Sequence, residues 1–279
     1  MTAADGLRLR GLFMPPQRGK PVLVHVHGNS GNFYENPFLD IMAQEYSKAG
    51  LGFLIFNNRG HDVIAEAYRF DHICYIGGAV ESYAESFFDL QAAMDFARQH
   101  SAVVLLQGHS FGCLKIVNYL SKSEQAIDAV LLSPADTLQL QRDFIYTESL
   151  EDQIKRLRRE YCGSLQQLLP TKEFGIREGT TEYLIPISAG TFLELFQSTF
   201  AEKLSYSTPI DYYLKSAVFV YCGAADPLLT SSMETIKTFF ERRFRTVRFC
   251  VERAGNHHLR SVEQKVAQKI ARWVLDQVI

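Results

Sequence analysis

Short apolar segments alternate with amphipathic ones along most of this chain, and this alternation restricts the possible folds more than any single motif does. The apolar segments have the length and composition of buried strands and lie at residues 21–28, 51–60, 102–108, 126–133, 216–223 and 246–255. The amphipathic segments have helical spacing and lie at residues 36–50, 81–100, 111–120 and 231–244, and after Ser261. Buried strands that alternate with helices predict an α/β fold with a mostly parallel central sheet flanked by helices.

The alternation stops between residues 135 and 215. Two stretches in this gap, 150–169 and 191–200, have helical patterns of their own, so the gap is too ordered to be a bare loop. We therefore expect a core at 1–134 and 216–279 and a helical cap insertion at 135–215. Its aromatic side chains could line a substrate cavity or pack within the cap, and we expect Phe192 and Phe196 to bind substrate; the other candidates are Phe144, Tyr146 and Phe200.

The segment Gly108-His109-Ser110-Phe111-Gly112 joins an expected strand to an expected helix. Taken alone, a G-x-S-x-G pattern is weak, and Ser110 could simply cap the helix in a tight turn. In this setting, however, it matches the strained turn that exposes a nucleophilic serine, and the glycines prevent collisions between strand and helix. The position predicts Ser110 as a nucleophile near the positive end of the helix.

A serine hydroxyl needs a base to take its proton and an acid to orient that base. In this type of fold the acid and the base follow the serine, after two late strands. Asp226 comes three residues after Gly223, and a histidine pair, His257 and His258, follows the last strand. We expect Asp226 as the acid, although Asp211 competes from a position before its strand. Both histidines are candidate bases, and the distance from the strand end favours His257.

The transition state also needs N–H donors for the oxyanion. One is the backbone N–H of Phe111, directly after the proposed nucleophile. A second is expected in the loop "HGNSGN" after the first buried strand, from the N–H of Asn29. The alternative is that this Gly- and Asn-rich loop only turns the chain.

The ordered segments "HGNSGN", "NNRGHD", "GHSFG", "GAADPL" and "GNHHL" resemble the landmarks of α/β-hydrolase-fold serine hydrolases over almost the whole chain. Within that fold, the chain resembles small capped esterases of the cinnamoyl or feruloyl esterase and serine aminopeptidase-like group. "HGNSGNFYEN" is also similar to the branch with fungal siderophore esterases. The resemblance implies hydrolysis of an ester, or of an amide or thioester, through an acyl-enzyme, with no metal or organic cofactor. A serine at position 110 argues against the carboxylate nucleophile of epoxide hydrolases and haloalkane dehalogenases.

One segment departs from the pattern of many relatives, which carry a Gly-x-Ser turn after "NNRGH". This chain has Asp62 and a long loop at residues 63–81. Its aromatic side chains either help to shape the substrate pocket or pack on the surface, and they are Tyr68, Phe70, His72 and Tyr75.

Two other functions use the same residues or the same scaffold. The triad could serve an acyltransferase, cyclase or peptidase that acts on a natural product or peptide. A non-catalytic binding protein could also use the scaffold, but it would not need all three groups of a triad.

The composition of the chain limits the kinds of partner that it is expected to bind. The chain has 279 residues and a formal net charge of −2, which gives no reason to expect nucleic acid. No apolar run approaches the roughly 18 residues of a membrane span, and the first residues lack the apolar core of a secretion signal. The five cysteines are scattered and form no CxxC pair, so we expect neither disulfides nor zinc, and a cytoplasmic location. The expected partner is a small-molecule ester or acyl substrate, and the sequence carries no signal for an oligomeric state.

Overall fold

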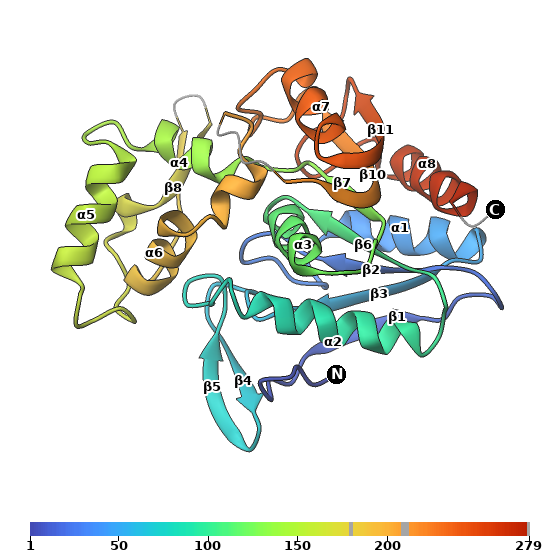
Figure 1. Ribbon diagram of the computed structural model, residues 1–279, viewed down its shortest axis with the longest axis horizontal. Helices are drawn as coiled ribbons and strands as arrows, with labels where there is room; N and C mark the ends of the chain where they lie inside the picture. The colour runs from blue at the N-terminus through green and yellow to red at the C-terminus, as the bar shows by residue number, and fades with distance from the viewer. Residues whose placement is uncertain (179–180, 208–211, 278–279) are drawn as a thin grey trace.

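The computed structural model describes residues 1–178, 181–207 and 212–277. Within these residues, seven strands form one mixed sheet (Figure 1). Their order across the sheet is β1 (Arg10–Met14), β3 (Gly52–Asn57), β2 (Val22–Val26), β6 (Val104–His109), β7 (Ala129–Leu132), β10 (Leu214–Gly223) and β11 (Phe244–Glu252). Only the edge strand β1 runs antiparallel to its neighbour. The predicted α/β class is confirmed, and β1 is a strand that the sequence pattern did not predict.

Helices cover both faces of this sheet. One face packs against α1 (Pro37–Lys48) and α8 (Glu263–Asp276), and the other against α2 (Ser86–Arg98), α3 (Phe111–Lys122) and α7 (Met233–Glu241). Successive side chains of a strand point to opposite faces, so Leu105 contributes to the core beside α1 and Leu106 to the core beside α3. Both residues are at most 2% exposed, which explains why the strand segments are apolar throughout.

The order of the strands creates a crevice at one end of the sheet. The chain passes from β2 to β3 on one side of β2, and then returns to β6 on the other side. The connections leave β2 and β6 toward different faces, with α1 on one and α3 on the other. Ligands of open α/β sheets bind at such a switch point, beyond the carboxyl ends of the strands. Gly28 and Ser110 follow the two strands that flank this point.

The segment between β7 and β10 lies beyond this end of the sheet (Figure 1), and we call it the insertion. It contains the helices that the sequence predicted and, in addition, an antiparallel hairpin. β10 begins at Leu214, two residues before the expected boundary. The elements of the insertion are α4 (Thr137–Phe144), α5 (Leu150–Glu160), the 3₁₀ turn Thr171–Glu173, β8 (Gly175–Glu178), β9 (Thr181–Leu184), α6 (Ala189–Gln197) and the 3₁₀ turn Ala201–Leu204.

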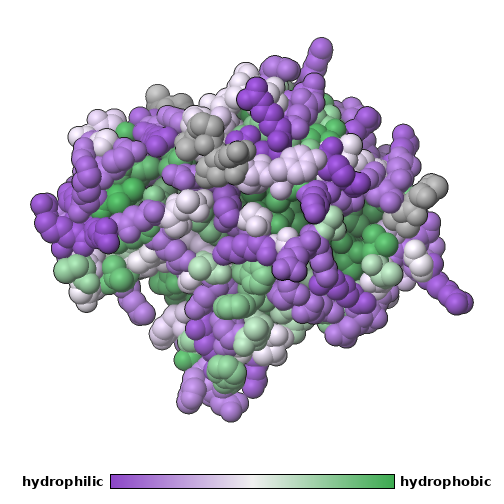
Figure 2. Space-filling model, in the orientation of Figure 1, coloured by the Kyte–Doolittle hydropathy of each residue, from purple (hydrophilic) through white to green (hydrophobic). Residues whose placement is uncertain are grey.

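The loop expected at residues 63–81 contains a second hairpin, β4 (Ala65–Arg69) and β5 (His72–Ile76), which projects from the body of the molecule (Figure 1). Hydrophilic side chains cover most of the face seen in Figure 2, and hydrophobic ones reach the surface in smaller areas between them. In the part of the chain described here, no helix has the length and apolar character needed to cross a bilayer.

Candidate active site

Ser110 occupies a sharp turn between β6 and α3. Its backbone has φ 54°, a left-handed value that is uncommon for a residue with a side chain. The flanking glycines make this turn possible, because a Cβ on Gly112 would lie 2.2 Å from the carbonyl oxygen of Val26. A Cβ on Gly108 would lie 2.8 Å from the nitrogen of Cys113. The turn therefore has the strain and the close packing that the sequence motif predicted, and it presents the Ser110 side chain to a cavity.

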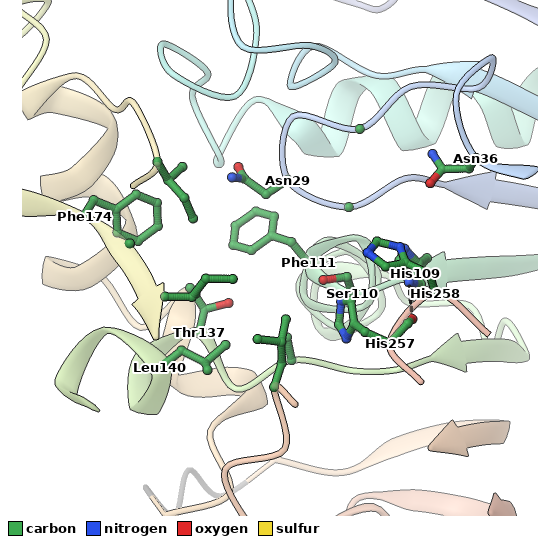
Figure 3. Close-up of a pocket in the computed structure, with 17 residues that line it drawn as sticks. Asn29, Asn36, His109, Ser110, Phe111, Thr137, Leu140, Phe174, His257 and His258 are labelled. Carbon is green, nitrogen blue, oxygen red and sulfur yellow. Dashed lines mark hydrogen bonds between the residues drawn. The ribbon is translucent and has the colours of Figure 1, made fainter. Parts of the chain in front are cut away.

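His257 and Asp226 come together at the same end of the sheet, from the loops that follow β11 and β10. The Nδ1 atom of His257 lies 2.9 Å from Oδ2 of Asp226, and both side chains are buried. The other carboxylate oxygen of Asp226 accepts the backbone N–H of Leu228 at 2.8 Å, which holds the carboxylate in place. His257 and Ser110 line one cavity, where Figure 3 draws both side chains.

His258, the other candidate base, is exposed, and its backbone N–H bonds to Asn256. Burial of part of the ring and the neighbouring His257 lower the pKa of His258. Among the described residues, the carboxylate of Asp226 contacts His257 and not His258. Asp211, the competitor of Asp226, lies outside the described residues.

The two expected oxyanion donors flank Ser110. Asn29 and Phe111 both line the cavity. Within the described residues, neither backbone N–H donates to a protein acceptor. Gly28 brings the loop of Asn29 close to the serine, because a Cβ on Gly28 would lie 3.1 Å from the Cβ of Ser110. Free amide groups beside a serine can stabilise an anionic oxygen.

The cavity has a volume of about 340 Å³, at the lower end of the range for small-molecule sites. Residues from core loops and from the insertion line it together. They are Gly28, Asn29, Gly31, Asn36, His109, Ser110, Phe111, Ala135, Thr137, Leu140, Phe174, Gly175, Ile176, Ile185, Leu228, His257 and His258. No Asp, Glu, Lys or Arg from the described part of the chain belongs to this set. Figure 3 shows Phe174, Thr137 and Leu140 on one side of Ser110, and Asn36 on the other.

Sequence reasoning missed His109, whose ring is buried beside the cavity. Its Nε2 donates a hydrogen bond to the backbone carbonyl of His257 at 2.8 Å. Burial and the neighbouring His257 lower the pKa of His109 well below its usual value, so this ring stays neutral. Its position inside the G-x-S-x-G pattern was the available signal, but the pattern does not specify that residue.

The expectation that Phe192 and Phe196 line the cavity is corrected by the structure. Phe192 is 0% exposed, and both rings pack against Phe174, which does line the cavity. The apolar face of α6 is therefore buried inside the insertion. Phe144, Tyr146 and Phe200 do not line this cavity either.

The aromatic residues of the 63–81 segment also lie away from the cavity. Tyr68, Phe70, His72 and Tyr75 are exposed on the β4–β5 hairpin, and none of them belongs to the cavity wall. Of the two readings of this segment, pocket or surface, the structure supports the surface.

No family model matches the chain, and no curated protein matches its sequence. Solved structures match over almost its full length. Est1E from Butyrivibrio proteoclasticus with bound ferulic acid has a TM-score of 0.65 at 15% identity, over 98% of this chain and 97% of that one. A monoacylglycerol lipase from Paleococcus ferrophilus has a TM-score of 0.64 at 16% identity, over 97% of this chain and 98% of that one. Mouse alpha/beta hydrolase domain-containing protein 10 has a TM-score of 0.67 at 15% identity, over 100% of this chain and 98% of that one. The chain therefore has the α/β-hydrolase fold, as its motifs predicted.

Proposed function

We propose that the protein is a serine hydrolase that cleaves a carboxylic ester through an acyl-enzyme. Ser110 is the nucleophile, His257 the general base and Asp226 the residue that orients His257. The observation that carries this proposal is the strained Ser110 on the same cavity as an imidazole bonded to a buried carboxylate. This constellation performs acyl transfer on many unrelated scaffolds.

In the first step, Oγ of Ser110 attacks the ester carbonyl carbon while Nε2 of His257 takes the serine proton. The Asp226 carboxylate accepts from Nδ1 of His257, which leaves Nε2 free to act as the base. The backbone N–H groups of Asn29 and Phe111 donate to the oxyanion. His257 then gives its proton to the leaving alcohol oxygen, and a water molecule releases the acid by the same route.

The cavity wall favours a neutral substrate with an apolar acyl group. The described residues supply no charged side chain that would pair with an ionised substrate. Burial keeps His109 neutral, and burial also lowers the pKa of His258. Leu140, Phe174 and Ile176 offer an apolar surface beside Ser110.

The insertion acts as a cap in this proposal, because it supplies that apolar surface while the reacting groups come from the core. Its residues form part of the cavity wall and would limit the access of water to the reaction, which strengthens the oxyanion contacts. The finer resemblance to feruloyl or siderophore esterases stays a prediction from the sequence motifs.

A fluorophosphonate probe tests the proposal, because it reacts with activated serines. Intact-mass spectrometry should detect one adduct on the natural protein and none on Ser110→Ala, and p-nitrophenyl butyrate turnover should fall by several orders of magnitude in that variant. An adduct or turnover that persists in Ser110→Ala would refute Ser110 as the nucleophile. A natural protein that binds esters without reacting would instead indicate a binding function.

A further inference from the structure

His27 lies directly after β2 and two residues before Asn29, and only 1% of its surface is exposed. It does not line the cavity. The backbone N–H of Asn58 donates to Nε2 of His27 at 3.2 Å, and Nδ1 of His27 lies 2.9 Å from the carbonyl oxygen of Gly28. A nitrogen that accepts a hydrogen bond carries no proton, so the single proton of the neutral ring is on Nδ1. His27 therefore donates to Gly28.

The carbonyl of Gly28 accepts a second hydrogen bond, from the backbone N–H of Gly31 at 3.2 Å. This carbonyl and the N–H of Asn29 belong to the same planar peptide unit and point in opposite directions. Two donors that fix the carbonyl on one side of the peptide therefore also fix the direction of the Asn29 N–H. Within the described residues, that N–H has no protein acceptor, and Asn29 lines the cavity.

We propose that His27 is a positioning residue that aims the N–H of Asn29 at the oxyanion. The inference rests on the proposed function, since it needs a reaction that develops an oxyanion beside Ser110. His27 touches neither the cavity nor the reacting groups, so it acts only through the peptide between Gly28 and Asn29.

A buried ion pair between Lys115 and Glu81 holds Asn58, whose backbone N–H orients His27. The side chain of Asn58 accepts from the backbone N–H of Gly60 at 3.0 Å and from Nζ of Lys115 at 2.9 Å. Lys115 also pairs with Glu81 at 2.6 Å, and both of these side chains are fully buried. Lys115 lies on α3, which begins directly after Ser110. This network therefore connects α3 to the loop that carries Asn29, which we call the oxyanion loop.

The buried surroundings also keep the imidazole of His27 neutral. Burial first, and then the positive charge of Lys115, lower the pKa of His27 well below its usual value. The Nδ1–H donor is therefore retained across the pH range in which the protein would be assayed.

Three substitutions at His27 and one at His25 test the inference. His27→Leu removes both hydrogen bonds. His27→Asn places an amide N–H the same number of bonds from the backbone as Nδ1, and His27→Gln places it one bond further away. His25→Leu is the matched control, because His25 is another buried imidazole of the same segment, but it contacts Gln107 and not the oxyanion loop.

The readouts are kcat and KM for p-nitrophenyl butyrate and the Ki of an alkyl trifluoromethyl ketone, which forms a tetrahedral oxyanion adduct with the serine. Thermal unfolding and the fluorophosphonate-labelled fraction verify folding. His27→Leu should lower kcat about 10- to 100-fold with little change in KM, because an oxyanion contact strengthens only in the transition state. The Ki should rise by a similar factor. His27→Asn should recover most of both losses, His27→Gln should recover less, and His25→Leu should keep its kcat.

Equal kcat and Ki in natural protein and folded His27→Leu would overturn the inference, as would an Asn variant no better than Gln. If His27→Leu does not fold, the comparison of Asn with Gln decides the question. Ser110→Ala, assayed in parallel, separates the two proposals. Loss of turnover in Ser110→Ala together with unaffected His27 variants would overturn only the role of His27, whereas turnover retained in Ser110→Ala would overturn both.

Discussion

Nδ1 of His257 lies 2.9 Å from Oδ2 of Asp226, although 30 residues separate them along the chain and each follows a different strand. The parallel neighbours β10 and β11 end at the same edge of the sheet, and this brings the two loops together. A carboxylate in this position accepts from Nδ1 and so keeps Nε2 unprotonated. The contact makes the role of Asp226 testable without removing the imidazole.

Asp226→Asn should lower kcat about 10³- to 10⁴-fold with little change in KM. The amide can donate to Nδ1 of His257, and this favours the tautomer with its proton on Nε2, which cannot accept the serine proton. Ester hydrolysis by purified protein at pH 7 measures the effect. Asp95→Asn, which removes an exposed carboxylate of α2, is the control and should stay near the natural rate. Near-natural kcat in Asp226→Asn would remove Asp226 from the mechanism.

The two adjacent histidines should differ sharply. His257→Ala should abolish turnover, because it removes the imidazole bonded to Asp226. His258→Ala should keep a substantial part of the activity, because His258 is exposed and does not contact that carboxylate. In the natural protein turnover should fall on acidification, since a protonated imidazole cannot accept the serine proton. If His258→Ala were inactive and His257→Ala active, the general base would be His258 and not His257.

The alternation of buried strands and helices predicted the α/β class, and the motifs at the strand ends carried the resemblance to the α/β-hydrolase fold. Both signals depend on local order along the chain. The same order placed Ser110, Asp226 and His257 at strand ends, and the structure brings these three residues together. The cavity wall did not follow from local order. The helical periodicity predicts that one face of α6 is buried. It does not predict whether Phe192 on that face points into the cavity or packs against Phe174, as it does in the structure.

The irregular parts of the chain were harder to predict for a related reason. β1 is largely exposed, so it lacks the continuous apolar run of the other strands. Phe174 and Ile176 lie in a short stretch whose alternation was too brief to indicate the hairpin β8–β9. Their approach to Ser110 depends on how the insertion folds back over the core, and one sequence contains no local signal for such a long-range contact.

If the proposed function is correct, Ile176→Ala should change which acyl chain the protein prefers. Ile176 lines the cavity and comes from the insertion, so its truncation enlarges the cavity beside Ser110. We expect turnover of p-nitrophenyl esters to shift toward longer acyl chains, while turnover of the acetate ester changes less than about threefold. Leu184→Ala is the matched control, because it removes a similar volume from the same hairpin at an exposed position outside the cavity. If both variants keep the natural ranking of esters, this part of the insertion does not select the acyl group.

Three buried histidines should make the protein sensitive to acid. Burial lowers the pKa of His25 to about 3 and the pKa values of His27 and His109 well below their usual range. In the unfolded chain each imidazole takes up a proton near pH 6.5, whereas in the native protein it stays neutral. The unfolded state therefore binds more protons in mild acid. The stability that each neutral ring contributes is complete above about pH 6.5 and is lost as the pH falls toward the native pKa.

The pH slope of stability in His25→Leu measures this effect for one ring. Each such imidazole contributes about 1.4 kcal/mol per pH unit to the slope of the unfolding free energy between about pH 6 and pH 4. Burial raises the pKa of Glu81 and Asp89, which act on the slope in the opposite direction, but they are present in both proteins. The difference between natural protein and variant therefore isolates His25. Urea unfolding at several pH values measures the free energy of unfolding. In His25→Leu the slope of this free energy against pH should be lower than in the natural protein by about 1.4 kcal/mol per pH unit, whatever the absolute stability of the variant. Parallel pH dependences would mean that the native protein already accepts a proton at His25.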